Sequence, residues 1–501
     1  MTPTLIDDTV KRILTSHVYD VAIESPIIKA RKLSRPAGCE VYLKREDLQP
    51  VHSFKIRGAY NKIYHLSQTE KSKGLITASA GNHAQGVAFA AKKLGISALI
   101  IMPRTTPAIK VEAVQSYGAE VELFGDNYSE AAEYCKKVIS QTGRTFIHPY
   151  DDPLVIAGQG TIGREILEQL PEVTHIFVPV GGGGLLAGVA AYVKALRPDV
   201  KVISVEPEDS NAMQESIKQG KRVTLNHVGI FADGVAVKQV GNNTFDTALH
   251  KVDDFISVNT DQMCAAIKRI FEETRSIVEP AGALGTAGLL QYGLPKSARA
   301  VAICSGANMT FERLQLVSER TLLGSGQEAM FAVTLPEKPG ALYKFCNEVV
   351  GGRNISEFSY RLNRRDAAHL LVGIGVSGLD DKQRIMDKMR ANGYEYSDLT
   401  MNEIAKEHIR HMIGGRSPEA RHEKIYEVTF PERPGALIDF LKIIGDKWNI
   451  SLFHYRSAAS DSGSVMIGFE AARSSELEKK IASTTYEFES VSDDLGIKLF
   501  F

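Results

Sequence analysis

The stretch that most constrains the fold is "FVPVGGGGLLAGVAA", residues 177–191, where four glycines interrupt an otherwise apolar run. An apolar run, a glycine break and a second apolar run predict a strand, a tight turn and a helix. Bare backbone amides before a helix favour a bound anion, because unpaired N–H groups and the helix dipole both attract negative charge. The stretch therefore predicts an anion-binding loop in an α/β fold.

The kind of anion is not settled by the glycines. The stretch lacks the Gly-Lys-Ser/Thr ending of a nucleoside-triphosphate loop. It does contain Gly182-x-Gly184-x-x-Ala187, and Glu206 ends the next apolar run about where a ribose-binding acid would lie. A dinucleotide therefore remains open at this point.

Up to about residue 322, short apolar runs alternate with longer helical segments. This alternation predicts a parallel sheet with helices on both faces, whose ligands bind at the carboxyl ends of the strands. Three glycine-bearing polar loops follow apolar runs directly: "SAGN", "GGGG" and "SGAN". Three such loops in one domain favour a binding site over simple chain connections.

Beyond residue 325 the chain contains an internal repeat. "FAVTLPEKPGALYKF" (331–345) returns as "YEVTFPERPGALIDF" (426–440), 95 residues later and without a gap. Each copy predicts a small antiparallel sheet with its helices on one face. Neither copy holds a credible catalytic set, so ligand sensing or assembly is favoured and a purely architectural role stays open. The polar stretch 405–423 between the copies predicts an exposed linker.

Composition excludes several classes of protein. The 59 Lys and Arg nearly cancel the 60 Asp and Glu, so no overall field would attract nucleic acid or an anionic membrane. No apolar run approaches the length of a membrane span, and the N-terminus lacks the apolar core of a signal peptide. The five cysteines are scattered without zinc-binding spacing. We expect a cytoplasmic protein with reduced thiols and no metal site.

The stretch "HSFKIRGA" (52–59) carries the strongest chemical signal. Lys55 lies between Phe54 and Ile56, and apolar neighbours lower a lysine pKa because they disfavour the ammonium. Arg57 is expected to act in the same direction. A lysine held neutral is a nucleophile toward aldehydes and forms Schiff bases.

Five motifs, "SFKIRGA", "SAGNHAQG", "VGGGGL", "EPAGA" and "CSGAN", occur in the order and spacing of the pyridoxal-phosphate enzymes of the tryptophan-synthase β-like superfamily. They most resemble its serine/threonine dehydratases. With its repeat, the whole chain resembles the family of biosynthetic threonine deaminases. The resemblance implies a fold-type II α/β catalytic domain (1–322), followed by two ferredoxin-like α+β ACT-like domains (328–401 and 423–494). The anion is then the 5′-phosphate of the cofactor, which replaces the dinucleotide hypothesis.

The resemblance also implies roles for individual residues. Lys55 would bind pyridoxal 5′-phosphate as a Schiff base beside Phe54, Asn82 would contact its phenolic oxygen, and Ser305 would contact its pyridine nitrogen. The phosphate would bind to the backbone amides of Gly181, Gly182, Gly183, Gly184 and Leu185. The substrate would lie against Ser79, Gly81, Asn82, His83 and Glu279.

The implied reaction converts L-threonine to 2-oxobutanoate and ammonia, the committed step toward isoleucine, with inhibition by isoleucine opposed by valine and a homotetrameric assembly. Effector clefts are expected near Leu342 and Phe345, or near Leu437 and Phe440; two sites, or one site where the copies pack together, are both possible. A catabolic serine/threonine dehydratase, a serine racemase, a threonine synthase and an amino-acid sensor without turnover are the alternatives.

Overall fold

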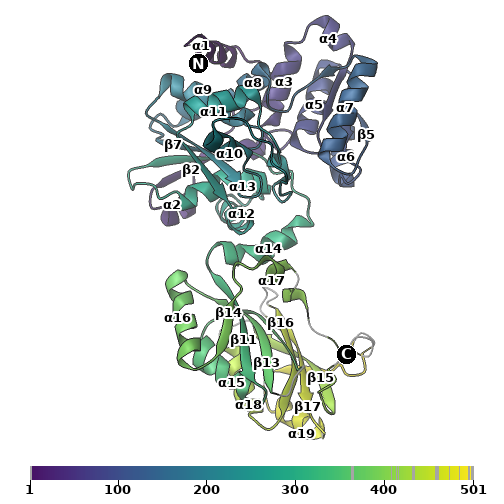
Figure 1. Ribbon diagram of the computed structural model, residues 1–501, viewed down its shortest axis with the longest axis vertical. Helices are drawn as coiled ribbons and strands as arrows, with labels where there is room; N and C mark the ends of the chain where they lie inside the picture. The colour runs from purple at the N-terminus through teal and green to yellow at the C-terminus, as the bar shows by residue number, and fades with distance from the viewer. Residues whose placement is uncertain are drawn as a thin grey trace. The chain divides into compact units, whose positions relative to one another are not determined.

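The computed structural model describes residues 3–362, 366–407, 409–412, 415, 417–431, 435–456, 462–472, 474–484, 486–494 and 497. The chain divides into two compact units, Met1–Thr321 and Leu322–Phe501 (Figure 1). They are called the N-terminal unit and the C-terminal unit, and each is described by itself.

The N-terminal unit contains a six-stranded sheet in the order β1-β2-β10-β7-β8-β9. Its strands are β1 (Ile27–Lys29), β2 (Glu40–Arg45), β7 (His175–Pro179), β8 (Lys201–Pro207), β9 (Asp254–Val258) and β10 (Arg299–Cys304), and only the edge strand β1 runs antiparallel to its neighbour. Alternate residues of β10 enter two different hydrophobic clusters, Ala300 and Ala302 in one and Val301 and Ile303 in the other. Both faces of this sheet are therefore covered, as the alternating pattern predicts.

A second parallel sheet of four strands has the order β5-β4-β3-β6. It consists of β3 (Leu75–Ala78), β4 (Ala98–Met102), β5 (Glu120–Leu123) and β6 (Thr145–Phe146), and it carries α5 (Asn82–Leu94), α6 (Ala108–Ser116) and α7 (Tyr128–Thr142). The sequence pattern predicts parallel strands without showing that they separate into two sheets. That division depends on which strands pair, and the local sequence does not encode pairing partners.

The three polar loops lie at the carboxyl ends of these strands. Asn82 begins α5 just after β3, Gly184 begins α9 (Gly184–Leu196) after β7, and Ser305 follows β10 directly. Parallel strands bring such loops to one edge of a sheet, where ligands bind in open α/β folds.

The C-terminal unit contains one antiparallel sheet of eight strands, in the order β14-β11-β13-β12-β16-β17-β15-β18 (Figure 1). The first copy of the repeat contributes β11 (Glu328–Pro336), β12 (Ile355–Arg361), β13 (Ala367–Gly375) and β14 (Glu395–Asp398); the second contributes β15 (Glu423–Pro431), β16 (Asn449–Arg456), β17 (Ser462–Glu470) and β18 (Glu487–Ser490). Both copies share one hydrophobic cluster, which takes in residues of α15 (Ala341–Phe345), α16 (Leu379–Ala391), α18 (Ala436–Ile444) and α19 (Ser474–Ala482). The predicted α+β copies are thus fused into a single sheet.

The two copies meet where β12 pairs with β16. Ser359 lies opposite His454, and these are equivalent positions of the repeat because they are 95 residues apart. A two-fold pseudosymmetry axis therefore passes through this pair. Strand pairing across the axis removes an exposed edge from each copy.

The stretch 405–423 is only in part the exposed linker that its polarity predicts, since its described residues include both exposed and buried ones. Within its described residues, Ala405, Lys406 and Arg410 are buried, and Arg410 forms ion pairs with Glu357 at 3.0 Å and Glu328 at 3.8 Å. The prediction fails at Arg410 because the carboxylates that neutralise this residue lie more than fifty residues away in the chain.

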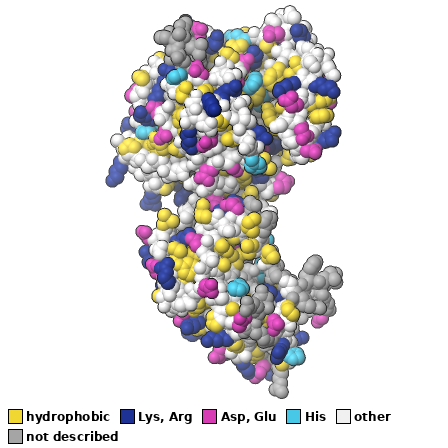
Figure 2. Space-filling model, viewed as in Figure 1, with side chains coloured by type: hydrophobic (Ala, Val, Ile, Leu, Met, Phe, Trp, Pro, Cys, Tyr) yellow, Lys and Arg dark blue, Asp and Glu magenta, His cyan; other side chains and the backbone are white. Residues whose placement is uncertain are grey.

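Dark-blue and magenta side chains are interspersed over the face of both units shown in Figure 2, in keeping with the balanced composition. Among the residues that the structure describes, no helix is long and apolar enough to cross a bilayer. The same residues contain no cluster of three or more His, Cys, Asp or Glu side chains able to hold a metal ion.

Candidate active site and a pocket in the C-terminal unit

Lys55 is the first residue of α3 (Lys55–Tyr64). Its side chain retains some accessible surface, but the amine lies deep in the protein and donates a hydrogen bond to the carbonyl oxygen of Pro149 at 3.0 Å. This burial lowers the pKa of Lys55 to about 8, although Glu279 opposes the shift. The ring of Phe54 lies 5.3 Å from Nζ. Lys55 therefore has the properties of a nucleophilic amine.

Arg57 does not contribute to this pKa in the way that the sequence suggests. It is fully buried and pairs with Glu46 at 2.7 Å and Glu165 at 2.5 Å, and Lys44 pairs with the same Glu165 at 2.6 Å. The four charges form a compensated cluster beneath α3. Sequence reasoning missed this cluster, because its members come from β2, α3, α8 (Pro153–Gln169) and the turn after β2.

Asn82 and Glu279 are brought together from positions 197 residues apart. The amide nitrogen of Asn82 donates to Glu279 Oε1 at 2.5 Å, and Asn308 donates to Asn82 Oδ1 at 2.7 Å. Burial raises the pKa of Glu279 to about 7, helped by the charge of Asp233. Asn308 is the last residue of the "CSGAN" motif, and its role is not predictable from the motif alone.

The glycine loop is packed too tightly for side chains. A Cβ at Gly182 would lie 2.2 Å from the ring of Tyr150, and one at Gly181 would lie 2.9 Å from the Cα of Val235. Gly183 has φ +92°, a conformation that favours glycine. The loop thus opens α9, and the first N–H groups of a helix have no intrahelical partners, as an anion site requires.

Ser305 lies beside the lysine segment. Its carbonyl oxygen accepts from the N–H of Phe54 at 3.1 Å, and Ser53 pairs with Gly306 in an isolated bridge. The Ser305 hydroxyl is buried and donates to the carbonyl of Ala281 at 3.3 Å. The segments that carry Lys55 and Ser305 are therefore held side by side by backbone hydrogen bonds.

The loop after β3 holds the other predicted residues, Ser79, Gly81 and His83. The Ser79 hydroxyl accepts from the N–H of Gly81 at 3.3 Å. His83 Nε2 lies 2.9 Å from the carbonyl of Ile147, so this nitrogen carries the proton, because a carbonyl only accepts. Burial and the charge of Lys55 lower the pKa of His83 to about 3, and its buried Nδ1 has no hydrogen-bond partner among the described residues. His83 is a neutral acceptor and not a cation.

Glu206 is not placed to bind a ribose. It is fully buried and accepts the backbone N–H groups of Met213 at 2.9 Å and Gln214 at 2.8 Å, at the start of α10 (Ala212–Gln219). Glu206, on which the dinucleotide hypothesis depended, instead binds the N-terminal backbone of α10.

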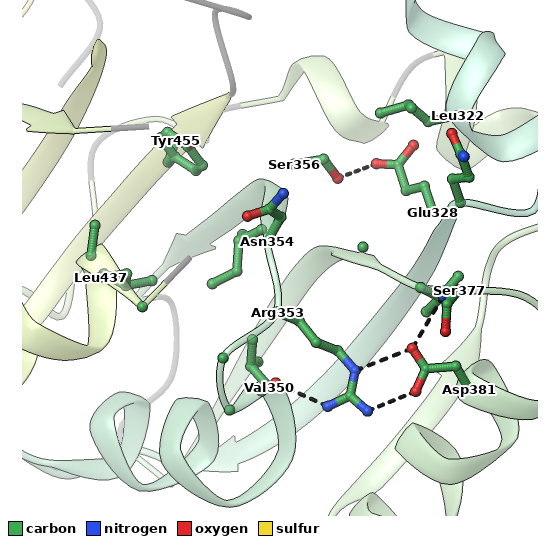
Figure 3. A pocket seen from close by; sticks show the side chains of 18 of the residues that line it. Leu322, Glu328, Val350, Arg353, Asn354, Ser356, Ser377, Asp381, Leu437 and Tyr455 are labelled. Atoms are coloured by element: carbon green, nitrogen blue, oxygen red, sulfur yellow. Dashed lines mark hydrogen bonds and ion pairs between the residues drawn. The ribbon is translucent and has the colours of Figure 1, made fainter. Parts of the chain in front are cut away.

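The C-terminal unit contains a pocket of about 860 Å³ lined by both copies of the repeat. From the first copy, Arg353 turns to Asp381, which it meets at 2.8 Å, and Ser356 donates to the buried Glu328 (Figure 3). Leu437 and Tyr455 of the second copy lie on the opposite side (Figure 3). Of the expected cleft residues, Leu437 lines this pocket, whereas Phe440 is buried in the core.

A second hollow of about 30 Å³ lies at the pseudosymmetric position. Its lining includes Leu342 and Tyr360, which are 95 residues before Leu437 and Tyr455. The counterpart of Arg353 is Trp448, whose side chain lines the small hollow. Similar sequences therefore form one open pocket and one that is nearly closed.

Comparison with known proteins agrees with this geometry. Residues 18–306 match the family described as pyridoxal-phosphate dependent enzymes, and residues 319–409 and 414–501 match the C-terminal regulatory domain of threonine dehydratase. The N-terminal unit is thus a fold-type II pyridoxal-phosphate enzyme, and the C-terminal unit consists of ACT-like regulatory domains.

The chain is similar over nearly its whole length to biosynthetic threonine dehydratases. It is 49% identical to the L-threonine dehydratase IlvA of Burkholderia multivorans, over 98% of this chain and 99% of that protein. It is 49% identical to the chloroplastic biosynthetic enzyme of Arabidopsis thaliana, over 97% of this chain and 83% of that protein. The processed form of threonine deaminase isoform 2 from Solanum lycopersicum superposes with a TM-score of 0.63 at 47% identity, covering 64% of this chain and 90% of that one. The chain belongs to the biosynthetic threonine dehydratase family.

The cofactor of this family is pyridoxal 5′-phosphate, and the residues present fit it. The site offers the buried amine of Lys55 and a glycine loop too tightly packed for side chains. It also holds two buried polar atoms, Ser53 Oγ and His83 Nδ1, that have no hydrogen-bond partner in the described part of the chain. An amine for the aldehyde and uncovered amides for the phosphate are what this cofactor requires.

Proposed function

We propose that the chain dehydrates L-threonine to 2-oxobutanoate and ammonia at the site around Lys55, as the committed step toward isoleucine. The observation that carries the proposal is the convergence of Lys55, Asn82, Ser305 and the glycine loop in a chain similar end to end to biosynthetic threonine dehydratases.

Nine residues are assigned to cofactor binding. The amine of Lys55 would hold the aldehyde carbon, and Phe54 would lie beside the ring. Asn82 would contact the phenolic oxygen and Ser305 the pyridine nitrogen, while the backbone of Gly181–Leu185 would bind the phosphate. Bound pyridoxal 5′-phosphate supplies an electron sink for negative charge at the substrate Cα.

Lys55 is proposed as the base that removes the Cα proton. A pKa near 8 leaves a useful neutral fraction at neutral pH, and general bases work best when their pKa lies near the working pH. Ser305 offers a hydroxyl, which unlike a carboxylate cannot keep a pyridine nitrogen protonated. This choice favours loss of the β-hydroxyl over transamination.

The substrate carboxylate is proposed to bind at the N-terminus of α5. Ser79, Gly81, Asn82 and His83 surround this helix start, whose free N–H groups and dipole suit an anion. His83 is neutral there, so its backbone and not its ring would contribute. Glu279 is proposed to lie beside the substrate and to orient Asn82 through their 2.5 Å hydrogen bond.

The direct test is release of 2-oxo acid from threonine and from serine, with and without isoleucine. A preference for threonine with isoleucine inhibition supports the proposal. Equal use of serine without inhibition would indicate a catabolic dehydratase. A protein that lacks the visible absorbance of a lysine-bound cofactor and has no turnover would be a sensor.

We also propose that isoleucine inhibits by binding in the 860 Å³ pocket and that valine opposes it there. Apolar residues of the second copy, such as Leu437 and Phe453, face the charged groups Arg353, Asp381 and Glu328 of the first. An α-amino acid with a branched apolar side chain has matching chemistry. A homotetramer in the cytoplasm, with domain bounds at 1–322, 328–401 and 423–494, completes the proposal; light scattering of the purified protein tests the assembly.

A further inference from the structure

A short segment of the N-terminal unit, residues 230–235, lies against three parts of the active site. Val235 packs on Gly181 of the phosphate-binding loop, where an added Cβ would lie 2.9 Å from its Cα. An added Cβ at Gly234 would lie 3.5 Å from Glu279 Oε1 and 3.7 Å from Asn82 Nδ2. A movement of this segment would therefore reach the phosphate loop, Glu279 and Asn82 together.

Two cations from different elements hold the segment. Lys110 of α6 meets Asp233 Oδ2 at 2.5 Å, which ties the segment to the four-stranded sheet. Arg313 donates to the carbonyl of Phe231 at 2.5 Å and to that of Ile230 at 3.2 Å, and lies 3.5 Å from Asp233 Oδ1. Single exposed ion pairs contribute little, but a planar guanidinium that binds several acceptors fixes geometry.

Arg313 also begins the helix that leads into the C-terminal unit. This helix, α14 (Arg313–Gly324), continues across the boundary between Thr321 and Leu322. Leu322 lines the 860 Å³ pocket, as do Ser325 and Glu328 just beyond the helix. Leu322 is nine residues from Arg313, about 14 Å along a helix axis. The helix α14 thus contains both Arg313, which holds the 230–235 segment, and Leu322, which lines the pocket.

We propose that Arg313 is the positioning residue that couples the regulatory pocket to the active site, by transmitting movement of α14 to the 230–235 segment. The inference rests on the proposed isoleucine regulation. An effector changes activity only if it binds one conformation more tightly than another, and a helix with one end in the pocket provides an element whose position the effector can bias. Lys110 would still hold Asp233 in place, so loss of the Arg313 contacts would uncouple the pocket from the segment while the segment stays against Glu279 and the phosphate loop.

A second set of contacts attaches α14 to the N-terminal unit and provides a control. Arg320 of α14 meets Asp261 at 3.3 Å, and Thr321 donates to the carbonyl of Cys264 at 3.3 Å, so α14 is also attached to α12 (Thr260–Thr274). Arg320→Met removes an ion pair of the same helix that does not involve the 230–235 segment. It is a matched control for Arg313→Met.

The experiment uses the full-length holoenzyme and three measurements. They are threonine turnover without effector, the isoleucine inhibition curve, and isoleucine binding followed by fluorescence of Trp448, the single tryptophan of the chain, which lies in the C-terminal unit. For Arg313→Met we expect turnover and binding close to wild type, while the ratio of activity without and with saturating isoleucine falls toward about 1. Arg320→Met should keep its inhibition.

Other results would contradict either the role of Arg313 or the proposed isoleucine regulation. Wild-type inhibition in Arg313→Met, or loss of inhibition only in Arg320→Met, overturns the role of Arg313 and leaves the proposed function standing. Loss of effector-free turnover or of isoleucine binding shows a structural role and also overturns it. A wild-type enzyme insensitive to isoleucine overturns the proposed regulation itself. If Arg313→Met does not fold, Arg313→Lys, which keeps a charge but loses the fork, should show partly reduced inhibition.

Discussion

The active site and the 860 Å³ pocket of the C-terminal unit differ in how their polar groups are paired. Around Lys55, two groups lack full partners among the residues that the structure describes: the amine donates to the carbonyl of Pro149, and His83 Nδ1 has no hydrogen bond. In the pocket of the C-terminal unit the charges neutralise one another, as Arg353 does with Asp381. A buried amine with few partners, such as that of Lys55, can react as a nucleophile or base. Charged groups that are already paired, such as Arg353 and Asp381, can exchange a partner for a ligand reversibly.

Removal of the amine should have the largest effect. Lys55→Ala should lower threonine turnover at least about 10³-fold, because the cofactor anchor and the Cα base are lost together. Isoleucine binding, read from Trp448 fluorescence, should persist. Lys62→Ala on the same helix, which removes only an ion pair with Asp152, is the control. Retention of a few per cent of turnover in Lys55→Ala would remove Lys55 from the mechanism.

Removal of the C-terminal unit should abolish isoleucine inhibition and leave threonine turnover in place. A chain ended after Ser325 should dehydrate threonine along a hyperbolic curve and show no response to isoleucine, because the pocket residues beyond that point are absent. The full-length protein assayed in parallel is the control. Inhibition at the same isoleucine concentrations in both proteins would place the effector site in the N-terminal unit.

The lowered pKa of Lys55 should be visible in the pH dependence of cofactor binding. Only the neutral amine attacks an aldehyde, so the rate at which cofactor-free protein binds added pyridoxal 5′-phosphate should rise with pH. With a pKa of about 8, the neutral fraction rises about 50-fold between pH 6 and pH 8 and then levels off. Glu279→Gln removes a charge that raises this pKa, and should move the midpoint lower. A rate that keeps rising toward pH 10.5 would contradict the lowered pKa.

Filling the pocket should act on regulation alone. Leu437→Trp should weaken isoleucine inhibition by about tenfold, since the indole would occupy apolar space in the pocket. Leu437→Met conserves volume and should behave as wild type. Effector-free turnover should not change in either variant. An unaltered inhibition curve for Leu437→Trp would place the effector elsewhere.

The smallest expected effect concerns the nearly closed hollow. Trp448→Ala should cost about 1–3 kcal/mol of stability in the C-terminal unit, because a large side chain is removed from partial burial. The isoleucine inhibition curve should shift by less than about twofold. Thermal unfolding and inhibition measured on one preparation test both statements. A large loss of inhibition would show that the small hollow is the effector site.

The sequence predicts the fold class well, because it is carried by local motifs, and the proposed site residues stand in the same motifs. The glycine loop, Lys55, Asn82 and Ser305 each stand in a short pattern with its own chemical meaning, and the structure brings them together. Whether they hold the cofactor as proposed stays a prediction for the experiments above.

Contacts between distant segments could not be predicted in this way. The 230–235 segment lies near the site through packing on Gly181 and Glu279, and its own sequence carries no motif. The buried ion pairs of Arg57 and Arg410 likewise depend on carboxylates that are far away in the chain. Polarity therefore suggested exposure at Arg410, where the fold supplies partners instead.

The pairing of β12 with β16 through Ser359 and His454 has a consequence for how the two copies can change over time. Two separate identical modules joined in this way would form an isologous dimer, in which every substitution appears twice. Once both modules belong to one chain, each half can vary alone, and the high effective concentration set by the linkage keeps them paired. Covalent linkage thus allows the two copies to differ in sequence. Arg353 and Trp448, which occupy equivalent positions on the two sides of the axis, are such a difference.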